Sequence, residues 1–200
     1  MKQTNKFASI AAIGYLLYLL IQIVINPLIT KVPPLLPSIL NVIYIVSFIV
    51  VAAWIISLDK TLKKPATFII IATTFGLVNR IFTIYMHGHL DMGTAKYSLI
   101  TTAFYLPHLI FSCMGFFKLA KGLPEGTLAR YMAKLVPWTA LASLIISSIF
   151  AILMVYMTIP HAVLRSPNTI AFLAEILAMM LLCYSLPKAI EIKRTIVTEN

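Results

Sequence analysis

Residues 66–86 read ATFIIIATTFGLVNRIFTIYM, an apolar stretch in which Arg80 is the single charged side chain. About 20 residues of α-helix cross the hydrocarbon core of a bilayer, so this stretch is long enough to span a membrane. We expect a helix because lipid offers no partners for backbone N–H and C=O groups, and a helix satisfies them within one segment. The stretch therefore predicts a transmembrane helix that carries a charge.

Five further apolar runs of similar length lie on either side of this one. They cover residues 7–26, 37–58, 97–117, 135–157 and 168–186. Hydrophobic residues make up 60% of the 200-residue chain, charged residues 11%, and the mean hydropathy is +0.96. Soluble domains carry about 25% charged residues, so this chain has too few polar groups for a surface in water. The fold class predicted is all-α, a polytopic transmembrane helical bundle of six spans in a single domain, residues 1–200.

Basic residues in the connections predict the orientation of this bundle. With the N-terminus inside, twelve basic residues face the cytoplasm: Lys2, Lys6, Lys60, Lys63, Lys64, Lys118, Lys121, Arg130, Lys134, Lys188, Lys193 and Arg194. Three face outward: Lys31, Lys96 and Arg165. By the positive-inside rule we expect a multi-pass protein of the plasma membrane with both termini cytoplasmic. We interpret the formal net charge of +10 as serving contact with anionic lipid headgroups. Nucleic acid is not predicted as a partner, because the chain has no stripe rich in Lys and Arg.

Two charged residues fall inside predicted spans, Arg80 and Glu175. A charge in the hydrocarbon region costs at least about 2.5 kcal/mol on insertion scales, so such residues are usually paired or functional. At 1.5 Å per residue, both lie roughly 9–10 Å below the predicted outer boundary. Equal depth and opposite charge predict an ion pair. Two interpretations stay open, a pair that only fixes helix register and a pair that belongs to a binding site. A third is that Arg80 alone reaches the outer headgroups.

Polar residues near Arg80 recur at helical spacing. In the span that carries Arg80, Thr73, Gly76, Arg80, Thr83 and His87 share one face. In the next span Tyr97, Thr101, Tyr105 and His108 do the same. Because these groups gather in the outer half, they predict a polar pocket open to the outside. The candidate ligand-binding residues are Arg80, Glu175, Tyr105, His108, Thr83 and Asn79.

The histidines admit more than one interpretation. His87, His89 and Asp91 lie in the predicted connection after residue 86 and are weak candidates for a metal site, so no metal is predicted. His108 has no second histidine at matching depth for a haem. It is either a proton-relay group or a neutral histidine bonded to a neighbouring hydroxyl. No cofactor and no catalytic residue is assigned.

Three functions are compatible with this pattern. The first is a membrane protein that binds or transports a small molecule or ion through the outward-facing polar pocket. The second is a membrane-embedded enzyme acting on a lipid or isoprenoid, although the common enzyme motifs are absent from the sequence. The third is a structural or accessory subunit without a ligand, which would have another membrane protein as its partner.

Overall fold

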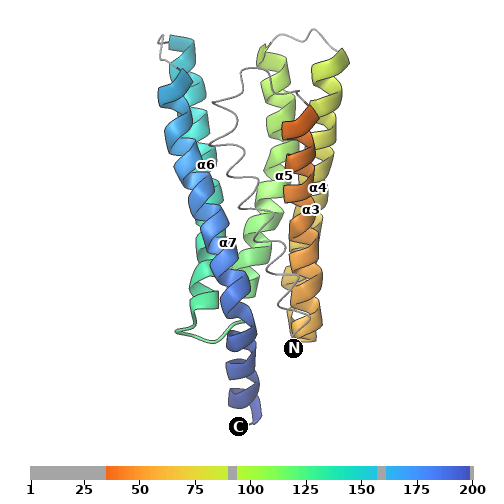
Figure 1. Ribbon diagram of the computed structural model, residues 1–200, viewed down its shortest axis with the longest axis vertical. Coiled ribbons are helices and arrows are strands. Elements are labelled where there is room, and N and C mark those ends of the chain that lie inside the picture. Colours follow the sequence, from red (N-terminus) through yellow and green to blue (C-terminus); the bar gives the residue numbers. More distant parts are fainter. Residues whose placement is uncertain (1–34, 90–93, 157–160, 199–200) are drawn as a thin grey trace. The chain divides into compact units, whose positions relative to one another are not determined.

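A computed structural model describes residues 35–89, 94–156 and 161–198 of the chain. Every regular element in these ranges is a helix, which confirms the all-α fold class for them (Figure 1). In chain order they are α3 (Leu35–Leu58), the short 3₁₀ helix η2 (Lys60–Leu62), α4 (Lys63–His89), α5 (Thr94–Lys121), α6 (Leu128–Tyr156) and α7 (His161–Thr198). The predicted span at residues 7–26 lies outside the described residues.

Two segments of these helices are long and apolar enough to cross a membrane. They are Lys60–Asn79 and Leu173–Thr198, and Phe48–Leu58 is a shorter apolar segment. The ends of α3, α4 and α5 lie within four residues of the predicted spans. By contrast, α6 begins seven residues before the predicted position, and α7 extends beyond both ends of its span. Lys, Arg and Glu favour helix, so a helix continues past its apolar part.

The connection between α3 and α4 is a tight turn closed by Asp59. The backbone N–H of Thr61 donates to the Asp59 carboxylate at 2.8 Å, and the N–H of Leu62 donates to the Asp59 carbonyl at 3.0 Å. Pro65 falls in the first turn of α4, where its missing N–H would have no partner within the helix. This turn makes α3 and α4 antiparallel neighbours.

The chain divides into two compact units, Met1–Leu119 and Ala120–Asn200. In the first unit, α3 packs on α4, and α4 contacts α5. Each of these helices buries one stripe of side chains at spacings of three and four residues. The buried residues include Phe48, Val51, Ala52 and Ile55 of α3, Ala66, Ile69, Ala72 and Thr73 of α4, and Leu109, Ser112, Phe116 and Leu119 of α5.

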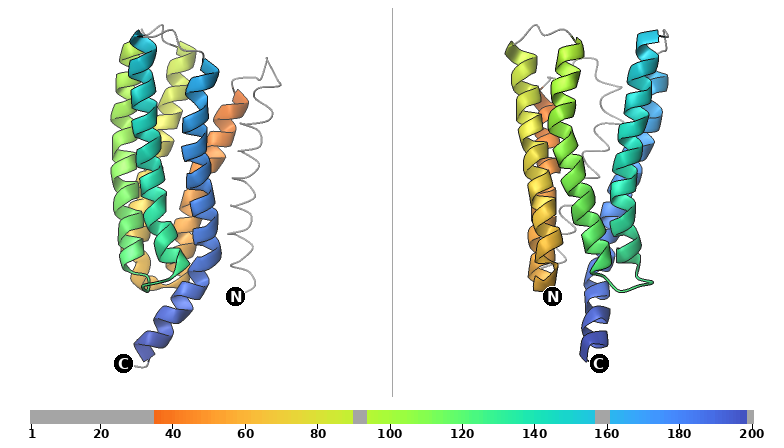
Figure 2. Two further views of the ribbon diagram at one scale, coloured as in Figure 1. Left: turned by 90° about the vertical axis from the view of Figure 1, so that its left-hand side faces the viewer. Right: turned by 180° about the vertical axis from the view of Figure 1, so that it is seen from behind.

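In the second unit α6 packs along α7, and the two helices run antiparallel (Figure 2). Their shared core holds Ala129, Ala133, Val136 and Ala140 of α6 and Ile176, Met179, Leu182 and Leu186 of α7. Arg130 bonds to two residues of the loop that precedes α6. One of its guanidinium nitrogens donates to the carbonyl of Leu123 at 3.2 Å, and another lies 2.8 Å from the Glu125 carboxylate.

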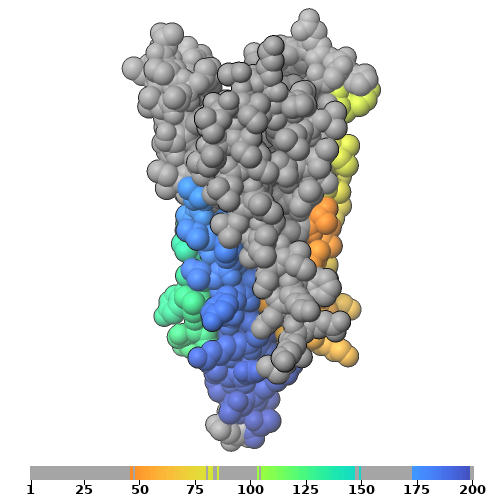
Figure 3. Space-filling model, in the orientation of Figure 1, coloured from red at the N-terminus to blue at the C-terminus, as the bar shows by residue number. Residues whose placement is uncertain are grey.

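Large apolar side chains also lie on the exposed faces of these helices. On α5, Leu106, Ile110 and Met114 repeat every four residues, and on α7 the side chain of Tyr184 is 85% exposed. The exposed side of α7 is part of the visible surface in Figure 3. Other exposed apolar residues are Val46, Val50, Val78, Ile81, Leu135, Trp138, Ile145, Ile149, Leu177 and Leu181. These helices are therefore apolar on both their packed and their exposed faces.

Candidate functional site

His108 on α5 is bonded to the backbone of α4. Its ring nitrogen Nδ1 lies 2.7 Å from the carbonyl oxygen of Ala72. A carbonyl oxygen can only accept, so Nδ1 must carry the proton and donate it. In the neutral ring the other nitrogen, Nε2, then holds a lone pair. Among the residues that the structure describes, no side chain or backbone group is hydrogen-bonded to Nε2.

Gly76 provides the space for this ring. A Cβ atom at Gly76 would lie 2.9 Å from Nδ1 and 3.2 Å from Cε1 of His108. Real Cβ atoms do not approach neighbours so closely, so the ring occupies the volume that a side chain at position 76 would need. The absence of a side chain lets the imidazole lie against the α4 backbone and reach the carbonyl one turn earlier.

Gly115 makes the reciprocal contact from α5. A Cβ atom there would lie 2.7 Å from Cγ1 of Ile69, 3.1 Å from its backbone nitrogen and 3.2 Å from the carbonyl oxygen of Pro65. On each helix the positions that make these two contacts are seven residues apart: 69 and 76 on α4, and 108 and 115 on α5. Seven residues are close to two helical turns, so both contacts lie on one antiparallel seam.

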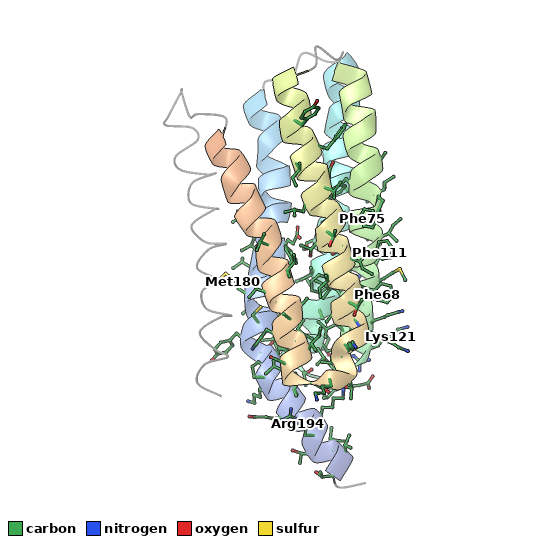
Figure 4. All side chains as sticks on the ribbon, turned by 90° about the vertical axis from the view of Figure 1, so that its right-hand side faces the viewer. Phe68, Phe75, Phe111, Lys121, Met180 and Arg194 are labelled. Carbon is green, nitrogen blue, oxygen red and sulfur yellow. The ribbon has the colours of Figure 1, made fainter. Side chains whose placement is uncertain are left out.

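Aromatic rings support the α4–α5 seam. The ring of Phe111 stacks between two phenylalanines of α4, with centroid distances of 6.2 Å to Phe68 and 5.7 Å to Phe75 (Figure 4). The ammonium group of Lys118 lies 4.2 Å from the Phe68 ring centroid, within the range of a cation–π interaction.

The register of the seam indicates what lies opposite Arg80. Continuing the pairing of position 69 with 115 and of 76 with 108 sets Asn79 opposite Tyr105 and Arg80 opposite Phe104. It also sets Thr83 opposite position 101. The Tyr105 ring lies 5.6 Å from the His108 ring at a tilt of 44°, and Oδ1 of Asn79 is buried. The side chains of Arg80 and Thr83 lie outside the described residues, so their position is known from the helix alone.

The predicted pair of Arg80 and Glu175 stays a prediction. Glu175 is half-buried on α7 in the second unit, whereas Arg80 belongs to the first.

Thr73 is buried, and its hydroxyl donates to the carbonyl of Ile69 at 2.7 Å. That bond within its own helix accounts for the Thr73 hydroxyl.

The prediction that His87 and His89 lie in a loop is wrong. Both residues lie in the last turn of α4, which ends at His89, because the helix continues beyond the apolar stretch at 66–86. Asp91 lies outside the described residues, as do the side chains of both histidines. Within the described part of the chain, no group of three His, Cys, Asp or Glu residues could hold a metal.

Sequence reasoning missed several members of the seam. The acceptor for His108 is a backbone carbonyl, whereas a hydroxyl was the expected partner. A carbonyl is present at every residue, so the sequence carries no signal for this one. Signals did exist for the rest, since Phe68 and Phe75 are seven residues apart and Gly115 interrupts a run of large side chains.

Comparisons with protein-family models, with curated proteins and with solved structures find no match for this chain. Function must then be argued from the geometry and chemistry of the site itself, because a fold alone does not specify an activity. The central group is the imidazole of His108, a polar side chain that is hydrogen-bonded across the α4–α5 seam.

The two glycines of the seam should respond differently to an added methyl group. Gly115→Ala meets backbone atoms of α4 that cannot move aside, so we expect it to cost about 1–3 kcal/mol. Gly76→Ala meets only the His108 ring, which can rotate away, so we expect it to cost about 1 kcal/mol for the lost hydrogen bond. Reversible unfolding in mixed micelles measures both values.

Ala103→Ser is the matched control, because it adds one atom to an exposed position of α5. Its free energy of unfolding should match that of the wild type. A larger cost for Gly76→Ala than for Gly115→Ala would contradict the seam described above.

Proposed function

We propose that this chain is a plasma-membrane protein with six transmembrane helices and cytoplasmic termini. In this proposal it binds or transports a small anionic molecule or ion through a polar pocket at the outer half of the α4–α5 seam. The observation that carries the proposal is the hydrogen bond from His108 to the Ala72 carbonyl, which holds an imidazole at the start of the polar part of the seam.

The apolar exposed faces support a location in the membrane. A helix at the surface of a soluble protein is polar on its outer side, and a helix that is apolar all round is buried or in contact with lipid. Here α5 and α7 expose large apolar side chains along their length, including Ile110, Leu177 and Tyr184. The two segments long enough to span a bilayer add to this support.

The distribution of lysines supports the orientation. In the first unit Lys60 lies in η2, Lys63 and Lys64 lie at the start of α4, and Lys118 lies over the Phe68 ring near the end of α5. They therefore gather at one end of this antiparallel pair. In the second unit the start of α6 and the late part of α7 are basic, with exposed Lys134 and Lys188. A basic end of this kind faces the cytoplasm and anionic headgroups.

The distance along α4 supports a pocket in the outer half. Gly76 follows Lys63 by thirteen residues, which is about 20 Å of helix. Arg80 follows Gly76 by one further turn, and His108 lies beside Gly76. A charge in the hydrocarbon region is costly unless it is paired. A small anion that enters from the outside would pair with Arg80 and lie near the imidazole of His108.

Release of bound molecules from purified protein tests the proposed binding site. We expect wild-type protein, denatured after purification in detergent, to release one small anionic species that mass spectrometry detects in near-stoichiometric amount. Arg80→Gln should reduce that amount at least tenfold, since a hydrogen bond to a charged group contributes about 1.5–3 kcal/mol. Lys121→Gln, at an exposed position, is the matched control and should release the wild-type amount.

Other outcomes of the same experiment favour the alternatives. A released lipid fragment or isoprenoid would favour the membrane enzyme. Equal release from wild type and Arg80→Gln, or no released species in any variant, would contradict the proposed site. The absence of any species would favour the accessory subunit.

Labelling of single cysteines tests the proposed topology. In a background of Cys113→Ala and Cys183→Ala, an impermeant maleimide should label Ala162→Cys in intact cells. Lys64→Cys, at the basic end of α4, should be labelled only after permeabilisation, because it should face the cytoplasm. The reverse pattern would overturn the orientation, and labelling of both positions in intact cells would argue against a membrane between them.

A further inference from the structure

We propose that His108 makes the site selective for an oxyanion that still carries a proton, such as hydrogen phosphate, over one that carries none, such as sulfate. This inference rests on the proposed function, because it assumes that Arg80 attracts an anion to the outer half of the α4–α5 seam. It goes further by naming the chemical class of the anion.

The imidazole of His108 is held in one orientation. Nδ1 donates to the Ala72 carbonyl at 2.7 Å, and the missing side chain at Gly76 leaves the ring against the helix backbone. Rotation of the ring by a half-turn would set a carbon atom against that carbonyl and lose the bond. The ring is therefore held with Nε2 pointing away from the Ala72 carbonyl.

A neutral imidazole held in this way is an acceptor at Nε2. Within the described parts of the chain, no group donates to that nitrogen, and the Tyr105 ring packs against the imidazole at a tilt. In the same ranges no carboxylate contacts the ring, so nothing there stabilises an imidazolium before an anion binds. A ligand at this position satisfies Nε2 when it brings its own hydrogen-bond donor.

Hydrogen phosphate can donate a hydrogen bond, and sulfate cannot. Both are tetrahedral oxyanions of similar size, and both can accept hydrogen bonds from an arginine at position 80. Phosphate keeps an O–H group near neutral pH, whereas sulfate has lost both protons. Sulfate would therefore set an oxygen lone pair against the lone pair of Nε2. A site built to accept a hydrogen bond rejects an analogue that cannot donate one, because the buried polar group is left unpaired.

The same chemistry could arrive as free phosphate or as the headgroup of a phosphomonoester lipid. Both bring an oxyanion with an exchangeable proton. The two sources differ in how they reach the outer half of the seam, so the test below includes an arm for each.

Calorimetric titration of the full-length protein tests the inference. With protein in phosphatidylcholine nanodiscs, we expect inorganic phosphate to bind at least tenfold more tightly than sulfate, the ratio that one hydrogen bond of about 1.4 kcal/mol produces. In a second arm, nanodiscs that also contain phosphatidic acid should weaken the apparent affinity for phosphate if the lipid is the natural source. An unchanged affinity would assign the site to free phosphate.

His108→Asn is the decisive variant. The asparagine amide can still donate to the Ala72 carbonyl, but it has no atom at the position of Nε2. We expect this variant to keep the wild-type unfolding temperature and to bind phosphate and sulfate with a ratio near one. His161→Asn, at the first residue of α7, is the matched control and should keep the tenfold preference.

The outcomes separate this inference from the proposed function. If wild type binds both anions equally and Arg80→Gln binds neither, the anion site stands and the selectivity proposal is overturned. If wild type binds neither anion, or if His108→Asn keeps the preference for phosphate, the selectivity proposal is overturned as well. The proposed function is judged separately, by the species released from purified protein.

Discussion

One hydrogen bond sets the geometry on which the rest of the account depends, from Nδ1 of His108 to the carbonyl of Ala72. It joins two helices directly through the backbone of one of them, and it forms because Gly76 has no side chain. Its loss should cost about 1 kcal/mol, the net contribution of an ordinary hydrogen bond. Together with the contact of Gly115 on Ile69, it defines the register of α5 against α4, and the register decides which residues of α5 lie opposite Arg80.

The all-helical class of the described residues follows from the sequence, because a long apolar stretch has to satisfy its backbone groups within one segment. A stretch that is apolar for about 20 residues has to be helical if it is in a bilayer, and α3, α4 and α5 match the predicted stretches closely. The ends of α6 and α7 do not match. Hydropathy shows where the apolar part of a helix ends. A helix that continues beyond that point is stabilised by its own backbone hydrogen bonds. The same effect moves His87 and His89 from a predicted loop into the last turn of α4.

The candidate site was predictable only in part. Spacing along single helices found His108, Tyr105 and Gly76, since residues three or four apart share a face. Contacts between helices were harder, because counting along the chain gives the depth of Glu175 and Arg80 but not whether their helices are neighbours. The Ala72 carbonyl has no signature in the sequence, and so the partner of His108 could come only from the structure.

Solid-state NMR of the protein in lipid tests the central claim most directly. With ¹⁵N in the histidine rings and ¹³C in the alanine carbonyls, the His108 signal is identified by its loss in His108→Asn. We expect a protonated Nδ1, an unprotonated Nε2 and a measurable dipolar coupling between Nδ1 and the Ala72 carbonyl carbon. A bare Nδ1, or a His108 ring without coupling to that carbonyl, would contradict it.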